Sequence, residues 1–198
     1  MRQKLLITGF DPFGKETINP SWEAVSRLSD VIGDWELSKL KVPTEFGVAA
    51  EVVLKEAEAF MPDVIICVGQ AGGRCAVMPE YVAINLRNAS MADNRGNMPR
   101  EESIRTDGPA AYFSTIPCSK IVDAVREAGI PGAISYSAGT YVCNDLFYSL
   151  RHRYEDTAVR VGFIHVPYLP AQTGSGCSLP SLPLDVIVQA LSCAILAL

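Results

Sequence analysis

The 198-residue sequence is poor in features that define several common classes of protein. It has no run of lysine and arginine and its formal net charge is −5, so it lacks the basic surface that neutralises the phosphates of a nucleic acid. Its six cysteines include no CxxC pair and follow no secretory signal, so neither a disulfide framework nor a zinc cluster is supported. We therefore expect a cytoplasmic protein with reduced thiols and no nucleic-acid partner.

Long uninterrupted apolar runs are missing as well. The first apolar stretch stops at Gly9, which is too early for a signal peptide and fits a strand. The C-terminal stretch 182–198 is very apolar, but Asp185, Gln189 and Ser192 interrupt it. A buried helix explains this pattern better than a membrane span, which needs about 20 predominantly apolar residues. The sequence thus predicts a soluble protein with no membrane partner.

The composition that remains is that of an ordinary globular protein, with 48% hydrophobic and 20% charged residues. A chain of this length buries most of its apolar surface in one core, so we expect a single domain over residues 1–198. Apolar runs predict strands at 4–10, 37–42, 63–69, 81–85, 133–137 and 160–166. Helical periodicity predicts helices at 20–28, 47–60, 119–128 and 144–154, and a last one within 182–198.

The alternation of strands and helices predicts an α/β fold. We expect a single-domain three-layer sandwich of the phosphorylase/hydrolase-like kind, in which a mostly parallel or mixed twisted sheet carries helices on both faces. In such sheets the ligand site lies beyond the carboxyl ends of the strands. The segment 86–109 has few apolar residues and several Asn, Arg, Gly and Pro, which is typical of a functional or mobile loop.

Only two histidines are present, so a histidine-dependent mechanism has two candidates. His152 lies on a predicted helix between Arg151 and Arg153, whose charges disfavour a protonated ring and suit a solvated surface. His165 ends an apolar strand just before Pro167. A buried histidine needs partners for both ring nitrogens, so His165 is either a satisfied core residue or a functional base.

Cys143 lies between a glycine-bearing strand end and the first turn of the predicted helix 144–154. The unpaired N–H groups and positive end of a helix favour a thiolate, which predicts a lowered pKa for this thiol. The same N–H groups can hold the oxyanion that forms when a thiolate attacks a carbonyl, and Asp145 can reinforce the helix start. The other cysteines lack a strand-to-helix elbow and are interpreted as packing or surface thiols: Cys67, Cys75, Cys118, Cys177 and Cys193.

A cysteine–histidine pair works better with a third group that orients the imidazole, and Glu80 is the candidate. It opens an apolar run after the glycine-rich loop 69–74, although this spacing by itself favours a solvated carboxylate at a strand end. The loop has neither the GK[ST] ending of a phosphate-binding loop nor the GxGxxG order of a dinucleotide site, which indicates a tight turn. The segment 135–139 lacks the first glycine of a GxSxG elbow, which argues against a serine hydrolase.

Two aromatic residues lie in an unusual setting near the first strand. Phe10 and Phe13 are separated by Asp-Pro in a loop flanked by glycines, a spacing that is poorly suited to a core stripe. Contact with a ligand is therefore an alternative to ordinary packing for both rings.

Five motifs follow one another along the chain: GFDPFG (9–14) with NPS (19–21), GQAGGR (69–74), EYVAIN (80–85), GTYVCN (139–144) and HVP (165–167). In order, spacing and total length they resemble the pyroglutamyl peptidase I family, also called pyrrolidone-carboxylate peptidases, over about residues 4–193. The resemblance implies a catalytic triad of Cys143, His165 and Glu80 that needs no metal or organic cofactor. It also implies that the substrates are peptides with an N-terminal pyroglutamate and that the chain forms a homo-oligomer.

The same resemblance implies a neutral pocket for the lactam ring, which carries no ammonium group. Backbone groups near Gln70 and the side chain of Asn19 would supply the polar contacts. The remaining pocket would be formed by Phe10, Phe13, Thr44, Met91, Tyr141 and Val142. The apolar segment 166–170 and the loop 171–183 are candidates for contacts between copies.

One segment departs from the family pattern. Relatives usually carry DARIPDN after the Glu80 strand, whereas residues 88–94 here read NASMADN, with Ser90 in the place of the arginine. Loss of its fixed donors and charge predicts weaker stabilisation of the oxyanion or of the substrate backbone, unless Arg87 or Arg95 compensates. Two alternatives stay open: a nucleoside-phosphorylase-like enzyme, since such enzymes use a related scaffold, and a non-catalytic binder of pyroglutamyl peptides.

Overall fold

The computed structural model describes residues 2–174 and 178–198, and its centre is a six-stranded sheet with the order β2-β3-β1-β4-β8-β5. The strands are β1 Gln3–Phe10, β2 Val31–Ile32, β3 Trp35–Val42, β4 Val64–Gln70, β5 Met78–Pro79 and β8 Arg160–Val166, with a separate pair β6 Val82–Ile84 and β7 Ala111–Phe113. The helices are α1 Pro20–Val25, α2 Val48–Phe60, α3 Cys118–Glu127, α4 Val142–Arg153, α5 Pro170–Thr173 and α6 Leu184–Leu196. Strands β3, β1, β4 and β8 are parallel, while β2 and β5 pair antiparallel at the two edges.

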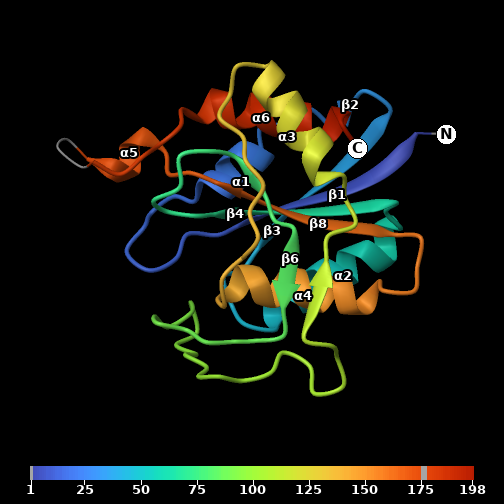
Figure 1. Cartoon of the computed structure of the whole chain (residues 1–198), viewed down its shortest axis with the longest axis vertical. Coiled ribbons are helices and arrows are strands. Elements are labelled where there is room, and N and C mark those ends of the chain that lie inside the picture. Colours follow the sequence, from blue (N-terminus) through green and yellow to red (C-terminus); the bar gives the residue numbers. More distant parts are fainter. Residues whose placement is uncertain (1, 175–177) are drawn as a thin grey trace.

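Side chains of the central strands alternate between two hydrophobic cores. On β1, Leu5 and Ile7 belong to one core and Leu6 to the other. Helices α1, α3 and α6 cover the first face, and α2 and α4 cover the second (Figure 1). Both faces of each central strand are therefore buried, which explains the unbroken apolar runs in their sequences. This is the three-layer α/β sandwich that the sequence predicted.

Two helix starts are informative. Asn19 caps α1 as predicted, since its side-chain oxygen accepts a hydrogen bond from the Ser21 N–H (3.1 Å) and Pro20 takes the first helical position. Helix α4 begins at Val142, two residues earlier than predicted, because the chain leaves its extended conformation at Tyr141. Cys143 therefore lies inside the first turn of α4.

Two of the six predicted strands differ in the structure. The predicted strand 81–85 becomes β6, which pairs with β7 outside the main sheet, and its Ile84 N–H donates to the side chain of Asn144 (2.9 Å). The segment 133–137 forms no strand and makes a single isolated bridge, between Ser135 and Glu80. Its neighbour β5 contains Pro79, which has no N–H to donate, so a regular ladder cannot continue there.

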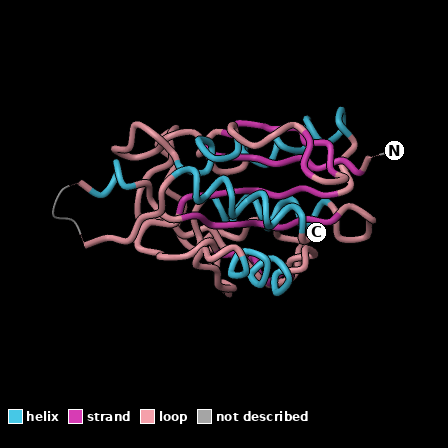
Figure 2. The backbone as a smooth tube through the Cα atoms, turned by 90° about the horizontal axis from the view of Figure 1, so that it is seen from above, coloured by secondary structure: helices cyan, strands magenta, loops and turns pink. Residues whose placement is uncertain are grey.

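The carboxyl ends of β1, β4 and β8 lie at one end of the sheet. Figure 2 shows many of the connecting loops gathered at the end opposite the N-terminus. The predicted irregular segment 86–109 forms neither helix nor strand and makes one bridge, between Arg87 and Glu102. Within the described part of the chain, no helix has both the length and the apolar character needed to cross a bilayer.

Candidate active site

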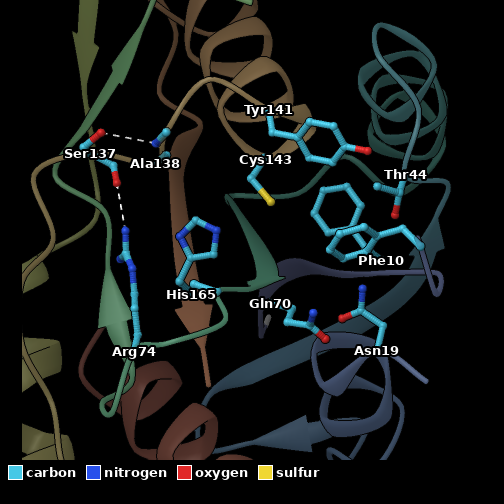
Figure 3. A pocket seen from close by; sticks show the side chains of 13 residues that line it. Phe10, Asn19, Thr44, Gln70, Arg74, Ser137, Ala138, Tyr141, Cys143 and His165 are labelled. Carbon is cyan, nitrogen blue, oxygen red and sulfur yellow. Dashed lines mark hydrogen bonds between the residues drawn. The ribbon is translucent and has the colours of Figure 1, made fainter. Parts of the chain in front are cut away.

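A cavity of about 370 Å³ lies beyond the carboxyl ends of β1, β4 and β8, where the fold predicted a ligand site (Figure 3). It takes residues from these strand ends, from the glycine-rich loop and from the segment that leads into α4. The lining residues are Phe10, Phe13, Asn19, Thr44, Gln70, Ala71, Arg74, Ser137, Ala138, Gly139, Tyr141, Cys143 and His165.

Cys143 enters this cavity from the first turn of α4. The N–H groups of Val142, Cys143 and Asn144 precede the first intrahelical hydrogen bond, which Asp145 donates to the Tyr141 carbonyl (3.1 Å). Gly69 makes room for the sulfur, since a Cβ at this position would lie 3.0 Å from the Cys143 Sγ. The thiol therefore has both a helix N-terminus and a close-fitting strand end beside it.

Burial raises the pKa of the Cys143 thiol to about 12, and the negative charge of Glu80 acts in the same direction. The predicted lowering of this pKa by the helix N-terminus is therefore wrong for the free site. The helix end favours the thiolate, but removal of the sulfur from water outweighs it. In the absence of substrate the site holds a thiol, and a base must take its proton during attack.

This protonation state predicts how Cys143 reacts with an alkylating reagent. The rate constant for iodoacetamide should rise about tenfold per pH unit between about pH 6.5 and 9.5, because only the thiolate reacts and its fraction grows at this rate below the pKa. Modification is followed by mass spectrometry of the peptide that contains Cys143, with the exposed Cys75 as an internal reference. A plateau that begins below pH 7 would show a preformed thiolate instead.

His165 and Glu80 form a buried pair next to the cysteine. The His165 Nδ1 lies 2.6 Å from the Glu80 Oε1, and both side chains are almost completely buried. Because a carboxylate only accepts, Nδ1 carries the hydrogen and the Nε2 is left as the free base. The imidazole and the Cys143 side chain both line the cavity (Figure 3).

Glu80 is not the solvated strand-end carboxylate that spacing by itself favoured. Its main-chain N–H donates to the Phe163 carbonyl (2.8 Å) and fixes the residue against β8, so its side chain is fully buried. Burial acts to raise the pKa of Glu80, but the hydrogen bond and charge of His165 and the charge of Arg74 hold it below its usual value. The carboxylate therefore stays ionised at neutral pH.

Arg74 is the functional residue that the sequence analysis missed. Its Nη1 donates to the same Glu80 Oε1 (2.7 Å), and its Nη2 donates to the Ser137 carbonyl (3.0 Å; Figure 3). It therefore joins the glycine-rich loop to the opposite cavity wall and partly offsets the charge of Glu80. An arginine six residues before a candidate carboxylate was the available signal, but the loop was interpreted only as a tight turn.

Replacement of Arg74 should shift the acid limb of the pH profile of kcat/KM. Arg74→Met removes the cation that lowers the pKa of Glu80, so that pKa rises and the acid limb of kcat/KM shifts to higher pH, while Arg74→Lys retains most of the charge and shifts it less. We expect kcat at neutral pH to fall about tenfold in Arg74→Met. An acid limb that stays in place in both variants would exclude this electrostatic role.

Aromatic rings form the apolar wall of the cavity. Phe13 lies 6.0 Å from Tyr141 between ring centroids, and Phe46 packs edge-on against Tyr141 at 5.3 Å from behind. Phe10 is 2% exposed and also packs on Phe163 of the core. Packing and cavity lining, which the sequence left as alternatives for Phe10, are therefore both present.

The loop after β1 is held by a hydrogen-bond network around Asp11. The Thr44 N–H and hydroxyl both donate to the Asp11 carboxylate (2.7 and 2.8 Å), and the Asn19 amide donates to the Asp11 carbonyl (2.9 Å). These bonds fix the loop that carries Phe13 and bring Thr44 and Asn19 to the cavity, where the resemblance placed them.

Two predicted pocket residues do not line this cavity. Val142 is fully buried in the core beneath α4, because its side chain points away from the cavity at the first helical position. Met91 is 40% exposed, and its terminal methyl group lies beside Gly14. The assignment of these two side chains to the pocket is therefore not supported by the structure.

Ser90 and the two arginines considered as substitutes for the missing one do not line the cavity. Ser90 is exposed. Two residues later, the Ala92 carbonyl accepts a hydrogen bond from the Tyr141 hydroxyl (3.0 Å). Arg87 pairs with Asp145 (2.6 Å), which also accepts from the Gly47 N–H. Asp145 thus connects the first turn of α4 to Arg87 and to the N-cap residue of α2, Gly47.

Arg95 pairs with Glu45 (2.6 Å), so neither arginine supplies a charge to the cavity. His152 contacts the Tyr112 hydroxyl (2.9 Å) in a half-buried position away from the site. Cys67 and Cys118 are buried, Cys193 is half-buried, and Cys177 lies outside the described residues. No group of three potential metal ligands occurs within residues 2–174 and 178–198.

The α/β fold and its site, in which a cysteine lies beside a buried histidine–carboxylate pair, define a hydrolase of the cysteine-peptidase class. The chain matches the family described as "Pyroglutamyl peptidase" over residues 3–198. It is 49% identical to the pyrrolidone-carboxylate peptidase of Bacillus subtilis, over 98% of this chain and 91% of that protein. The corresponding protein of Lactobacillus helveticus is 50% identical, over 97% of this chain and 96% of the other.

Solved structures agree with the sequence relatives. The crystal structure of pyroglutamyl peptidase I from Bacillus amyloliquefaciens is similar with a TM-score of 0.94 and 49% identity, over 98% of this chain and 95% of that chain. The pyrrolidone carboxyl peptidase of Thermococcus litoralis reaches a TM-score of 0.94 at 33% identity, over 98% and 92%. The chain belongs to the pyroglutamyl peptidase family. The resemblance seen in its motifs is thereby confirmed, and the phosphorylase alternative loses its support.

Proposed function

We propose that this protein hydrolyses the bond after an N-terminal pyroglutamyl residue, with Cys143 as nucleophile, His165 as general base and acid, and Glu80 as the group that orients His165. The observation that carries the proposal is the 2.6 Å contact between His165 Nδ1 and Glu80 Oε1 at the edge of a cavity that also contains Cys143. This contact leaves Nε2 free to exchange a proton with the thiol.

In the first half of the reaction, the Cys143 Sγ attacks the carbonyl carbon of the pyroglutamyl peptide bond while His165 Nε2 takes the thiol proton. A C–S bond forms and the carbonyl oxygen becomes an oxyanion, which the free N–H groups in the first turn of α4 stabilise. The C–N bond then breaks, and the amine leaves with the proton from Nε2. The product is a pyroglutamyl thioester and a shortened peptide.

In the second half, water loses a proton to His165 Nε2 and attacks the thioester. The C–S bond breaks, pyroglutamate leaves, and the proton returns to Cys143. Because burial raises the pKa of Cys143, we assign the proton transfer to His165 to the step in which the sulfur attacks. The ionised Glu80 stabilises the imidazolium that forms in both halves.

The cavity suits a neutral ring rather than a charged N-terminus. Its wall is formed by Phe10, Phe13 and Tyr141, and Arg74 is the one arginine, lysine or carboxylate residue among the described residues that line it. An N-terminal ammonium would be placed near this cation, whereas a lactam offers only a carbonyl and an N–H to neutral groups. Peptides with an N-terminal pyroglutamate are therefore the substrates we assign.

Inhibitors distinguish this thiol mechanism from metal-assisted hydrolysis. Release of the reporter amine from a pyroglutamyl aminocoumarin amide should continue in EDTA and should cease after treatment with iodoacetamide in proportion to modification of Cys143. Inactivation by EDTA, with full activity after alkylation of Cys143, would overturn the proposal. Tight binding of the substrate without turnover would favour the binder alternative.

We further propose that the chain acts in the cytoplasm as one domain over residues 1–198, binds neither nucleic acid nor membranes, and forms a homo-oligomer. The segment 166–170 and the described part of the loop 171–183 are the assigned contact regions between copies, and Leu179 in that loop is 47% exposed. Part of this loop lies outside the described residues. Sedimentation equilibrium should show a mass above that of one chain, and a monomer would reject this assignment.

A further inference from the structure

We propose that Gln172, on α5, is a positioning residue that determines which end of the Gln70 side-chain amide faces the cavity. The inference rests on the proposed function, since it concerns how the cavity recognises a lactam ring. Gln70 ends β4 and lines the cavity. Gln172 follows 102 residues later, does not line the cavity, and contacts Gln70 from behind.

The amide orientation of Gln172 is fixed by two partners of opposite character. The Leu169 main-chain N–H donates to the Gln172 Oε1 (3.0 Å), and a main-chain N–H can only donate. The Gln172 Nε2 donates to the Glu16 carboxylate (3.0 Å), and an ionised carboxylate can only accept. Exchange of the oxygen and nitrogen of Gln172 would break both bonds.

This orientation determines that of Gln70. The Gln172 Nε2 also donates to the Gln70 Oε1 (2.8 Å). The side-chain oxygen of Gln70 is therefore hydrogen-bonded to Gln172, which does not line the cavity. Its nitrogen points toward the interior of the cavity in Figure 3. Within the described residues this nitrogen has no acceptor. The cavity therefore presents a neutral hydrogen-bond donor at the end of β4.

Two other polar side chains of the lining use their donors on the loop after β1. The Asn19 Nδ2 donates to the Asp11 carbonyl (2.9 Å), and the Thr44 hydroxyl donates to the Asp11 carboxylate (2.8 Å). We assign the Gln70 amide nitrogen as a donor to the lactam carbonyl of the substrate. An N-terminal proline, which has the same ring without that carbonyl, would leave this donor unpaired and would be disfavoured.

The chain of contacts makes a specific prediction for Gln172→Glu. A carboxylate at this position still accepts from the Leu169 N–H, but it can no longer donate to Gln70. The Gln70 amide must turn to donate its nitrogen, which brings its oxygen opposite the lactam carbonyl. KM for a pyroglutamyl aminocoumarin amide should rise about tenfold, while kcat stays within about twofold, because Gln172 touches none of the reacting atoms.

Three further variants separate positioning from a general structural role. Glu16→Gln combined with Gln172→Glu removes the repulsion between two carboxylates and should retain the high KM. Thr173→Ala on the same helix, where the hydroxyl donates only to the Pro170 carbonyl, should match the wild type. In a Gln70→Ala background, Gln172→Glu should leave KM unchanged, since the amide that it orients is gone.

The outcomes distinguish this inference from the proposed function. A wild type that does not hydrolyse the amide overturns the proposed function and this inference with it. An active Gln172→Glu variant with an unchanged KM overturns only the inference. The same holds if Gln172→Glu raises KM equally in the Gln70→Ala background, because the effect would then not pass through the Gln70 amide.

Discussion

Replacement of Cys143 by serine should reduce kcat for a pyroglutamyl aminocoumarin amide by at least about 10⁴-fold, since nucleophile replacements in related mechanisms cost up to about 10⁶. A serine hydroxyl fits the space beneath Gly69 but is a much weaker acid than a thiol, so His165 cannot activate it comparably. KM should change little, because the ring contacts remain.

The matched control for this variant is Cys193→Ser. Cys193 lies on α6, which covers the face of the sheet opposite to α4, and it is half-buried as Cys143 is. It should retain wild-type activity. Equal losses in both variants, or appreciable turnover by Cys143→Ser with a normal unfolding temperature, would contradict the assignment of Cys143.

The second large effect is expected for Glu80→Gln, which should lower kcat about 10³- to 10⁴-fold. A glutamine amide can donate to His165 Nδ1, which favours the tautomer that carries its hydrogen on Nε2 and cannot accept the thiol proton. The variant also leaves Arg74 without its anion. KM should again stay near that of the wild type, and a loss of less than tenfold would show that Glu80 is not needed to orient the imidazole.

Glu80→Gln also has a pH-dependent effect on stability. The folded pKa of Glu80 lies below its usual value of about 4.3, so its ionised form stabilises the fold fully above that value and progressively less as pH falls through the folded pKa. Loss of this buried interaction should cost about 2 kcal/mol at neutral pH. The difference in unfolding temperature between wild type and variant should therefore shrink in acid, and a difference independent of pH would argue against this linkage.

The central layers of the fold could be predicted from local patterns. Strands β1, β4 and β8 are continuous apolar runs because both of their faces are covered, and the α1 start was readable from Asn19 and Pro20. The strand predicted at 133–137 does not form, and the strand predicted at 81–85 forms as β6 outside the main sheet, for a different reason. Their partners are distant in the chain: the Asn144 amide bonds to the carbonyls of Ile84 and Leu86 and draws this segment onto α4.

The site shows the same division between local and distant causes. Cys143 was identifiable from its place at a helix start, and the structure adds that burial reverses the expected shift of its pKa. Glu80 and Arg74 acquire their environment from tertiary contacts: Glu80 is bonded to Phe163, and Arg74 to Ser137. The local sequence around Glu80 and Arg74 does not indicate these distant partners. Glu80 was therefore interpreted as solvated, and Arg74 was overlooked.

The most direct test of the account is to trap the covalent intermediate. Wild type is mixed with an activated pyroglutamyl ester, for which deacylation should limit turnover, and is quenched in acid before peptide mapping by mass spectrometry. The account predicts one pyroglutamyl group on the peptide that contains Cys143, absent from Cys143→Ser and present in Cys193→Ser. Rapid turnover with no adduct, or an adduct on another residue, would contradict a thioester at Cys143.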